Sequence, residues 1–208
     1  MNHQSIHPGA QIDPAAKIDE STIIGANCQV GPQVVTSVKV SIGKDTRILG
    51  AVTIGPCVII GPGVTLVGPL EIKADVQIGA NAVIGVEITA GSSLQCGLIG
   101  KGAHIGEHAI VLGKLSIGEF ALVRPGARLA GDLPPHAAAA GCPAALVDFI
   151  CECGQSYAVR LLAGELYLCI CPACQSDYRL SKLDLDKRGR DLLPGQQAGE
   201  QLPPWADH

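Results

Sequence analysis

The sequence is organised by a stretch in which an aliphatic residue returns at every sixth position, as in Ile48-Leu-Gly-Ala-Val52-Thr-Ile54-Gly-Pro-Cys-Val58-Ile-Ile60. The residue four places after each of these is also small or apolar, so both positions are expected to face a core. Counted from the N-terminus, the first positions are Ile6, Ile12, Ile18, Ile24, Val30, Thr36, Ile42, Ile48, Ile54, Ile60, Leu66, Ile72, Ile78, Ile84 and Ala90.

The count slips by three residues at Cys96-Gly97-Leu98 and then resumes. The later first positions are Ile99, Ile105, Val111, Ile117, Val123 and Leu129. The sequence therefore predicts fifteen hexads, a three-residue insertion and six further hexads.

A period of six fits neither a helix nor a simple alternating strand, and a short fixed repeat is typical of a solenoid. The residue after the first position is often glycine, which suits repeated corners. The pattern resembles the left-handed parallel β-helix of the hexapeptide-repeat acyltransferases, in which three hexads form one triangular coil. This resemblance implies an all-β fold with a left-handed parallel β-helix of about seven coils over residues 1–146.

Composition agrees with a narrow solenoid and limits the partners. The chain has 208 residues, of which 47% are hydrophobic but 3% are aromatic, so the predicted core consists of Ile, Val, Leu and Ala layers. The net charge of −4, without a Lys/Arg cluster among aromatic residues, argues against a nucleic-acid partner. The N-terminus lacks an apolar stretch of signal-peptide length, and no apolar segment is long enough to span a membrane. We therefore predict a cytoplasmic protein.

Two segments near the end of the repeat resemble coenzyme A-dependent hexapeptide transferases. The segment 99–113 is similar to their late-coil signature, and the segment 131–144 is similar to their closing D-[VIL]-P-P…G-x-P-A stretch. The resemblance implies that acetyl-coenzyme A lies along the groove between subunits at the last coils. By position, the groups expected near it are Lys101, Gly113, Lys114, Arg124 and Arg128.

The predicted register gives candidate catalytic residues. His108 is fourth in its hexad, and the fourth residue three hexads earlier is Glu87. A carboxylate about 4.8 Å from an imidazole on the next rung would hold its tautomer and raise its basicity, as a general base requires. His104, a second candidate, is predicted to stack between Val83 and Leu122, an apolar strip that favours a homotrimer.

Cysteine spacing predicts a metal site after the repeat. Cys171-Pro-Ala-Cys174 has the two-residue spacing with which two thiolates bind one Zn²⁺, and Cys151-Glu-Cys153 resembles the other half of a zinc ribbon. We predict a structural zinc bound by these four residues, with Cys169 as a possible substitute. The zinc-ribbon module is expected at 147–181, and a segment this short has too little core to fold without a bound metal. A flexible tail is expected at 182–208.

A solenoid followed by such a ribbon resembles some N-acetyltransferases of UDP-linked amino sugars, and this resemblance implies a coenzyme A-dependent acetyltransferase. One alternative is a non-catalytic scaffold or assembly protein, because three residues are few for the loop that covers the acceptor in many relatives. A weaker alternative is a γ-class carbonic anhydrase relative, which needs three histidines around one zinc. Two histidines, His104 and His108, lie in the appropriate region.

Overall fold

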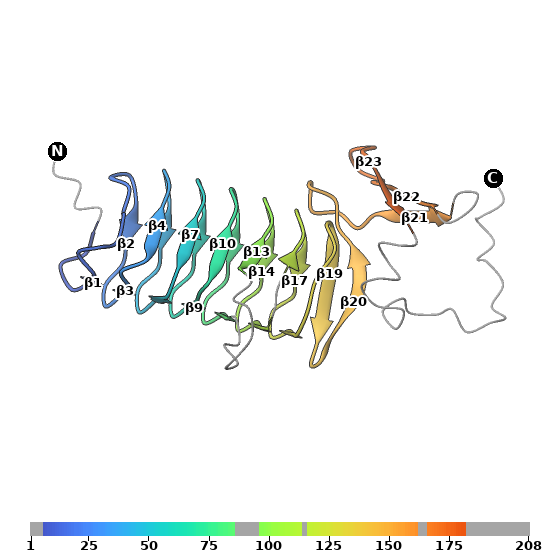
Figure 1. The fold of residues 1–208 in the computed structure, drawn as a ribbon. Helices are drawn as coiled ribbons and strands as arrows, with labels where there is room; N and C mark the ends of the chain where they lie inside the picture. The colour runs from blue at the N-terminus through green and yellow to red at the C-terminus, as the bar shows by residue number, and fades with distance from the viewer. Residues whose placement is uncertain (1–5, 86–95, 114–115, 162–165, 182–208) are drawn as a thin grey trace.

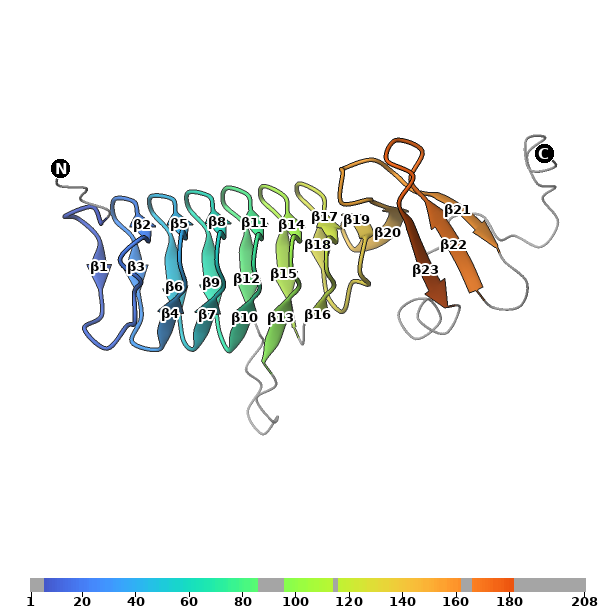
Figure 2. The same cartoon turned by 90° about the horizontal axis from the view of Figure 1, so that it is seen from above.

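The computed structural model describes residues 6–85, 96–113, 116–161 and 166–181. These residues form a three-sided prism of stacked coils, followed by a small sheet beyond the last coil (Figures 1 and 2). The described ranges contain strands and turns and no helix, and therefore no helix that could cross a membrane.

Each side of the prism is a sheet to which successive coils contribute strands, and the eight-strand sheet ends with one further hairpin strand, β20 (Ala144–Phe149). The seven-strand face contains β1 (Gln11–Ile12), β3 (Gln29–Val30), β6 (Arg47–Leu49), β9 (Thr65–Val67), β12 (Val83–Gly85), β15 (Ile110–Leu112) and β18 (Arg128–Leu129). The five-strand face contains β4 (Val34–Thr36), β7 (Val52–Ile54), β10 (Leu70–Ile72), β13 (Gly97–Ile99) and β16 (Ser116–Ile117). The eight-strand face contains β2 (Ile23–Ile24), β5 (Ser41–Ile42), β8 (Ile59–Ile60), β11 (Gln77–Ile78), β14 (His104–Ile105), β17 (Leu122–Val123), β19 (Ala137–Gly141) and β20 (Ala144–Phe149).

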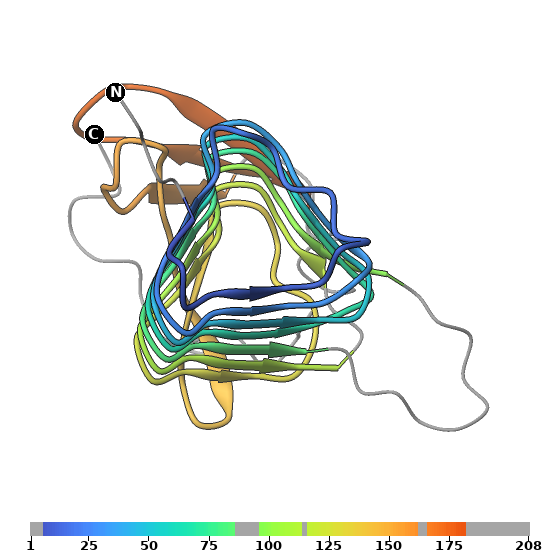
Figure 3. The same cartoon turned by 90° about the vertical axis from the view of Figure 1, so that its left-hand side faces the viewer.

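The coils are parallel and left-handed, as predicted. Gln11 pairs with Gln29 and Gln29 pairs with Arg47, so one coil takes 18 residues, or three hexads. Figure 3 looks along the axis from the N-terminal end, and the chain turns counterclockwise as it recedes, which defines a left-handed coil. The seven strands of the seven-strand face correspond to the seven expected coils, with six complete turns between the first and the last.

Both predicted inward positions of the hexad are buried. Ile48, Val52, Ile54 and Val58 are at most 1% exposed, and the same pattern continues along the prism. Polar residues at these positions are satisfied inside the core: the hydroxyls of Thr22 and Thr36 lie 2.9 Å apart.

Glycine follows the inward aliphatic residue because neighbouring coils approach closely there. A Cβ atom added to Gly43 would lie 2.5 Å from the backbone nitrogen of Pro62, on the next coil. A Cβ atom on Gly79 would lie equally close to the nitrogen of Glu107. These glycines are therefore required by contact between coils, a reason that the corner argument from the sequence did not include.

The predicted three-residue insertion is wrong. Across the irregularity, Leu70 pairs with Gly97 and Gln77 pairs with His104, so partners are 27 residues apart instead of 18, an excess of nine. Nine is one hexad plus three, and a count of sixth positions detects the three alone. The excess lies between β12 and β13; the hexad that begins at Ala90 is outside the described residues.

The chain leaves the prism through an antiparallel hairpin of β19 and β20 and enters a second sheet. That sheet consists of β21 (Ala158–Leu161), β22 (Leu166–Ile170) and β23 (Asp177–Ser181), all antiparallel. Strand β20 crosses the expected domain boundary at residue 146, and Phe149 and Cys151 join the hydrophobic cluster of the prism. The small module therefore packs on the end of the β-helix.

Candidate functional site

The prism has three corners. The first corner joins the eight-strand face to the seven-strand face, the second joins the seven-strand to the five-strand face, and the third joins the five-strand to the eight-strand face. His108 lies at the first corner, between β14 and β15, with φ 57°. Its N–H donates to the oxygen of Ala80 at 2.9 Å, and the N–H of Gly126 donates to the oxygen of Glu107 at 2.8 Å. In register, His108 therefore lies between Asn81 and Gly126.

The predicted pairing of Glu87 with His108 is wrong. It required Ile84 to lie one coil before Ile105, but Ile84 pairs with Val111, and Ile105 pairs with Ile78. The nine-residue excess, taken as three residues in the sequence, moved the count onto the wrong face. Glu87 itself lies outside the described residues.

The predicted environment of His104 is half right. His104 is exposed on β14 and pairs with Leu122, as predicted, but its other partner is Gln77 and not Val83. Val83 lies on the seven-strand face, where it pairs with Thr65 and Ile110. Val83 and Leu122, which were expected to form one apolar strip, therefore lie on two different faces of the prism.

Three of the candidate residues lie together around the first corner in the last coils. His108 is exposed, and a Cβ atom placed on the neighbouring Gly126 would meet nothing within 4 Å, so the space beside this glycine is open. Arg124 lies at the same corner, one coil further on, and its N–H donates to the oxygen of Ala139 at 2.8 Å. Arg128 is the exposed residue that begins β18, in register with Ile110. The corner thus combines an accessible imidazole with two cations.

The other cofactor candidates lie elsewhere. Gly113 lies at the second corner with φ 99°, and a Cβ atom there would meet nothing within 4 Å, so its backbone is accessible to a ligand. It shares that corner with the nine-residue excess, because its N–H donates to the oxygen of Gly85 at 3.2 Å. Lys101 is exposed at the third corner, and Lys114 lies outside the described residues.

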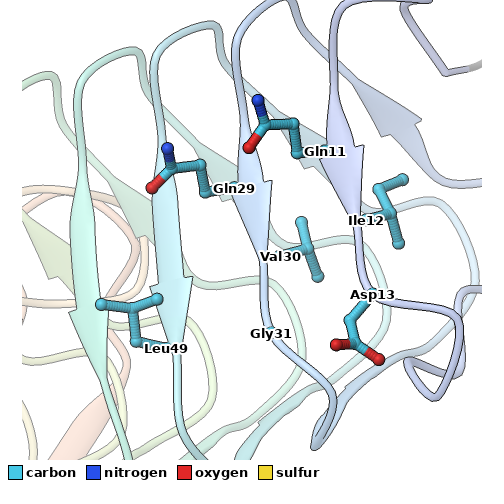
Figure 4. Close-up of a pocket in the computed structure, with 7 residues that line it drawn as sticks. All are labelled: Gln11, Ile12, Asp13, Gln29, Val30, Gly31 and Leu49. Atoms are coloured by element: carbon cyan, nitrogen blue, oxygen red, sulfur yellow. The ribbon is translucent and has the colours of Figure 1, made fainter.

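A shallow groove lies at the opposite end of the seven-strand face from His108 (Figure 4). Its lining includes the amides of Gln11 and Gln29, which lie side by side, and it is hollow because Gly31 has no side chain between Asp13 and Leu49. It contains none of the predicted site residues.

The four predicted zinc ligands come together. The sulfur atoms of Cys151, Cys153, Cys171 and Cys174 all lie within 4.8 Å of one another. The Sγ atoms of Cys151 and Cys174 are 3.5 Å apart, as are those of Cys153 and Cys171. Tetrahedral Zn²⁺ with its usual bond lengths to sulfur places ligand atoms about 3.8 Å apart, so the cluster fits this metal.

Cys169 is not part of the cluster. It is fully buried in β22, and burial raises the pKa of its thiol to about 11. It is therefore a protonated core residue, and the alternative in which it replaces a ligand is not supported.

The electrostatics of the cluster favour a bound cation. Burial opposes ionisation of Cys151, but hydrogen bonds from the Ser176 hydroxyl and the Cys153 amide outweigh it and lower the pKa of this thiol to about 6. For Cys153, the Gln155 amide acts to lower the pKa, but the sulfur atoms of Cys171 and Cys151 raise it to about 12. The protein thus stabilises some thiolates at the expense of others, and a divalent cation would remove this conflict.

Sequence reasoning missed the residues that support the cluster. The hydroxyl of Ser176 lies 3.1 Å from the sulfur atoms of both Cys151 and Cys174. His136 on the last coil and Tyr157 in the module are both buried, and their ring centroids lie 5.7 Å apart. Gln155-Ser156 and Gln175-Ser176 follow the two cysteine motifs, and this repetition was the available signal for Ser176; His136 had none.

We expect one zinc ion per chain in protein purified without a chelator, because four thiolates at this spacing satisfy the full coordination of the metal. Elemental analysis against protein concentration measures this directly. A metal content near zero, in protein whose thiols are reduced, would contradict the assignment.

The fold and this site define a class: a left-handed parallel β-helix that ends in a four-cysteine cluster with the geometry to hold a metal ion. No protein-family model matches the sequence. A stretch of 56 residues is 36% identical to dTDP-3-amino-3,6-dideoxy-alpha-D-galactopyranose 3-N-acetyltransferase of Aneurinibacillus thermoaerophilus, and it covers 27% of this chain. The match spans 29% of that relative's length.

Solved structures with similar coils share less sequence. A mutant of perosamine N-acetyltransferase from Caulobacter crescentus, in complex with CoA and GDP-perosamine, is 22% identical, with TM-score 0.32, over 68% of this chain and 55% of its own. A mutant N-acyltransferase from Bacillus cereus, in complex with dTDP and coenzyme A, is 19% identical, with TM-score 0.42, over 66% and 79%. These overall similarities are low, and the fold is assigned from the strand order of this chain.

Proposed function

We propose that the protein is a coenzyme A-dependent acetyltransferase that acylates the amine of a nucleotide-linked amino sugar. The observation that carries this proposal is the 36% identity to a sugar 3-N-acetyltransferase over 56 residues. The six-residue period runs through the coils of this chain on both sides of the nine-residue excess. His108 and Arg124 at the first corner, with Arg128 on the strand that follows this corner, support the proposal.

The proposed reaction uses these groups in distinct roles. The amine nitrogen of the sugar attacks the thioester carbonyl of acetyl-coenzyme A, an amide bond forms, and the carbon–sulfur bond breaks. His108 takes the proton that the nitrogen loses, and the coenzyme A thiolate is protonated on release. Arg124 and Arg128 bind phosphate oxygens, as cations at an exposed corner can. Lys101, Lys114 and the backbone of Gly113 are assigned further contacts to coenzyme A.

His108 has no carboxylate in register, which changes its proposed activation. The residue one coil before it is Asn81, and the residue one coil after it is Gly126. The imidazole is exposed, so it can accept a proton from a substrate that reaches this corner. His104 remains a second candidate for this role.

Of the alternatives, the scaffold hypothesis has lost its main argument. It rested on an insertion of three residues, whereas the register shows an excess of nine at the second corner. The carbonic anhydrase hypothesis needs three histidines near one metal. Within the part of the chain that the structure describes, the group of potential metal ligands is the four-cysteine cluster, which contains no histidine.

We expect the protein to bind acetyl-coenzyme A in isothermal titration calorimetry, because the proposed reaction requires this cosubstrate. The titration is repeated with Arg124→Ala and Arg128→Ala, which should weaken binding, and with Arg47→Ala as control. Arg47 lies on the seven-strand face in the same column as Arg128 but four coils earlier, so its loss should leave affinity unchanged. Absence of binding by the wild-type protein would sink the proposed function.

We also propose a cytoplasmic homotrimer. Apolar side chains are exposed on two different faces: Ile23 and Ile59, 57% and 53% exposed, on the eight-strand face, and Leu49, 44% exposed, on the seven-strand face. In a cyclic trimer each subunit presents one surface to one neighbour and a different surface to the other, so apolar residues on two faces suit this symmetry.

Light scattering coupled to gel filtration is expected to give three times the chain mass of 21.4 kDa. Charged residues on both faces, as in Ile59→Lys together with Leu49→Lys, should shift the mass towards that of one chain. A monomeric wild-type protein at micromolar concentration would contradict this proposal.

A further inference from the structure

An aromatic stack runs along the third corner at the end of the β-helix. Gly102, Phe120 and His136 occupy the same corner position on three successive coils, with φ of 65°, 54° and 60°. The N–H of Phe120 donates to the oxygen of Lys101 and that of His136 to the oxygen of Glu119, each at 2.8 Å. The rings of Phe120 and His136 are stacked at 5.3 Å, and a Cβ atom on Gly102 would lie 2.5 Å from the Phe120 ring.

The aromatic residues appear only in the coils that adjoin the four-cysteine module. In earlier described coils the same corner position, with the same left-handed φ, holds Lys39, Cys57 and Asp75. The backbone therefore does not require an aromatic residue here. His136 is 7% exposed, although its counterparts Lys39 and Cys57 are exposed. The change in residue type coincides with the place where the module packs on the prism.

His136 holds the chain next to a metal ligand. The N–H of Ile150 donates to the backbone oxygen of His136 at 2.6 Å, and Nδ1 of His136 lies 3.0 Å from the oxygen of Ile150. Because a carbonyl oxygen can only accept, Nδ1 carries the proton in this contact. Both backbone groups of Ile150 are thus bonded to His136, and Ile150 immediately precedes Cys151.

Two tyrosines of the module connect His136 to the cysteine cluster. The His136 ring lies 4.4 Å from the ring of Tyr178 and 5.7 Å, edge to face, from that of Tyr157. The phenol of Tyr157 donates a hydrogen bond to the Cys151 sulfur. A continuous set of contacts therefore joins the cysteine cluster to Phe120 and to the coil of Gly102.

We propose that His136 is a positioning residue through which the metal-loaded module holds the last coils of the β-helix in place. Without metal, the two halves of the module lose the ion that joins them, and a module of this size has too little core to stay folded. Tyr157, Tyr178 and Ile150 then no longer hold His136, and Phe120 loses its covering ring. Metal loading thereby determines how rigidly the backbone is held at the third corner, where Lys101 lies. This inference does not depend on the proposed acetyltransferase activity.

Hydrogen exchange of the full chain, with and without metal, tests the proposal. Removal of zinc by a chelator, verified by elemental analysis, is expected to increase backbone exchange in residues 116–139 and to leave residues 23–67 unchanged. Exchange in 116–139 that stays the same after verified zinc loss would overturn the proposal. A uniform increase along the whole prism would also overturn it, because the effect would then be global unfolding.

The role of His136 is tested by zinc release to a colorimetric chelator. His136→Ala is expected to release zinc about ten-fold faster or more, the usual scale for loss of a residue that orients a metal ligand. Asp75→Ala is the matched control, because it introduces the same residue at the same corner with the same φ of 60°, two coils before Phe120. It should release zinc at the wild-type rate.

Equal release rates for His136→Ala and the wild type would refute the assignment. If His136→Ala does not fold, Phe120→Leu gives the same test, because leucine keeps most of the volume but lacks the ring that stacks on His136. Wild-type zinc release and wild-type exchange in Phe120→Leu would then count against the proposal.

Discussion

Replacement of His108 by Asn is expected to lower the turnover of acetyl transfer by about 10²-fold or more, the usual scale for loss of a general base. Asparagine is the appropriate replacement because Asn27 and Asn81 occupy the same corner position with φ of 56° and 58°, so the backbone remains unstrained. The affinity for acetyl-coenzyme A should be nearly unchanged, because binding is assigned to other groups. Steady-state kinetics and calorimetry measure the two effects separately.

His104→Asn distinguishes the two candidates for the general base. His104 is exposed on the strand that precedes the same corner, so its replacement changes the local charge and hydrogen bonding without removing the proposed base. Turnover by His104→Asn should stay close to that of the wild type. Full activity in His108→Asn would disprove its role, and loss of activity in His104→Asn alone would assign the base to His104.

Replacement of Cys171 by Ala is expected to abolish stoichiometric zinc binding and to unfold the terminal module. Structural zinc sites of this kind contribute on the order of 10 kcal/mol of binding free energy, all of it coupled to folding, and three thiolates retain only part of it. Cys171 is fully buried within the cluster, so the position cannot recruit water as a replacement ligand without exposing the core. Elemental analysis and limited proteolysis measure the result.

Cys169→Ala provides a matched comparison, because Cys169 is as deeply buried as Cys171 and lies two residues away. Its side chain is outside the cluster, and burial raises the pKa of its thiol to about 11. The variant should keep one zinc per chain. If Cys169→Ala lost zinc and Cys171→Ala kept it, the ligand set would have to be reassigned.

The fold could be predicted because its information is local and repeated. Each hexad places the same residue types at the same positions, so the inward positions followed from counting, and burial of Ile48 and Val52 confirms them. The cysteine cluster could be predicted for a similar reason, since each of the two short motifs fixes the spacing of its own two cysteines. The coil pattern and the cysteine cluster can both be predicted from short stretches of sequence, without knowing which distant residues are in contact.

The pairing of Glu87 with His108 failed because it depended on register across an irregularity. A hexad count gives the length of an insertion only to within a multiple of six, and three and nine residues are indistinguishable in it. The pairing of Leu70 with Gly97 resolves the ambiguity. His136 was missed because its importance comes from Ile150, Tyr157 and Tyr178, which lie beyond the repeat.

The nine-residue excess between β12 and β13 has a consequence for how such a protein can change. After the excess, Gln77 pairs with His104 and Val83 with Ile110, and the strands continue as if the chain were uninterrupted. Each coil contacts its neighbours alone, so a corner can lengthen without displacing any other coil. Selection can therefore alter the length and chemistry of one corner freely while the prism, the column of corner residues and the four-cysteine module keep their positions.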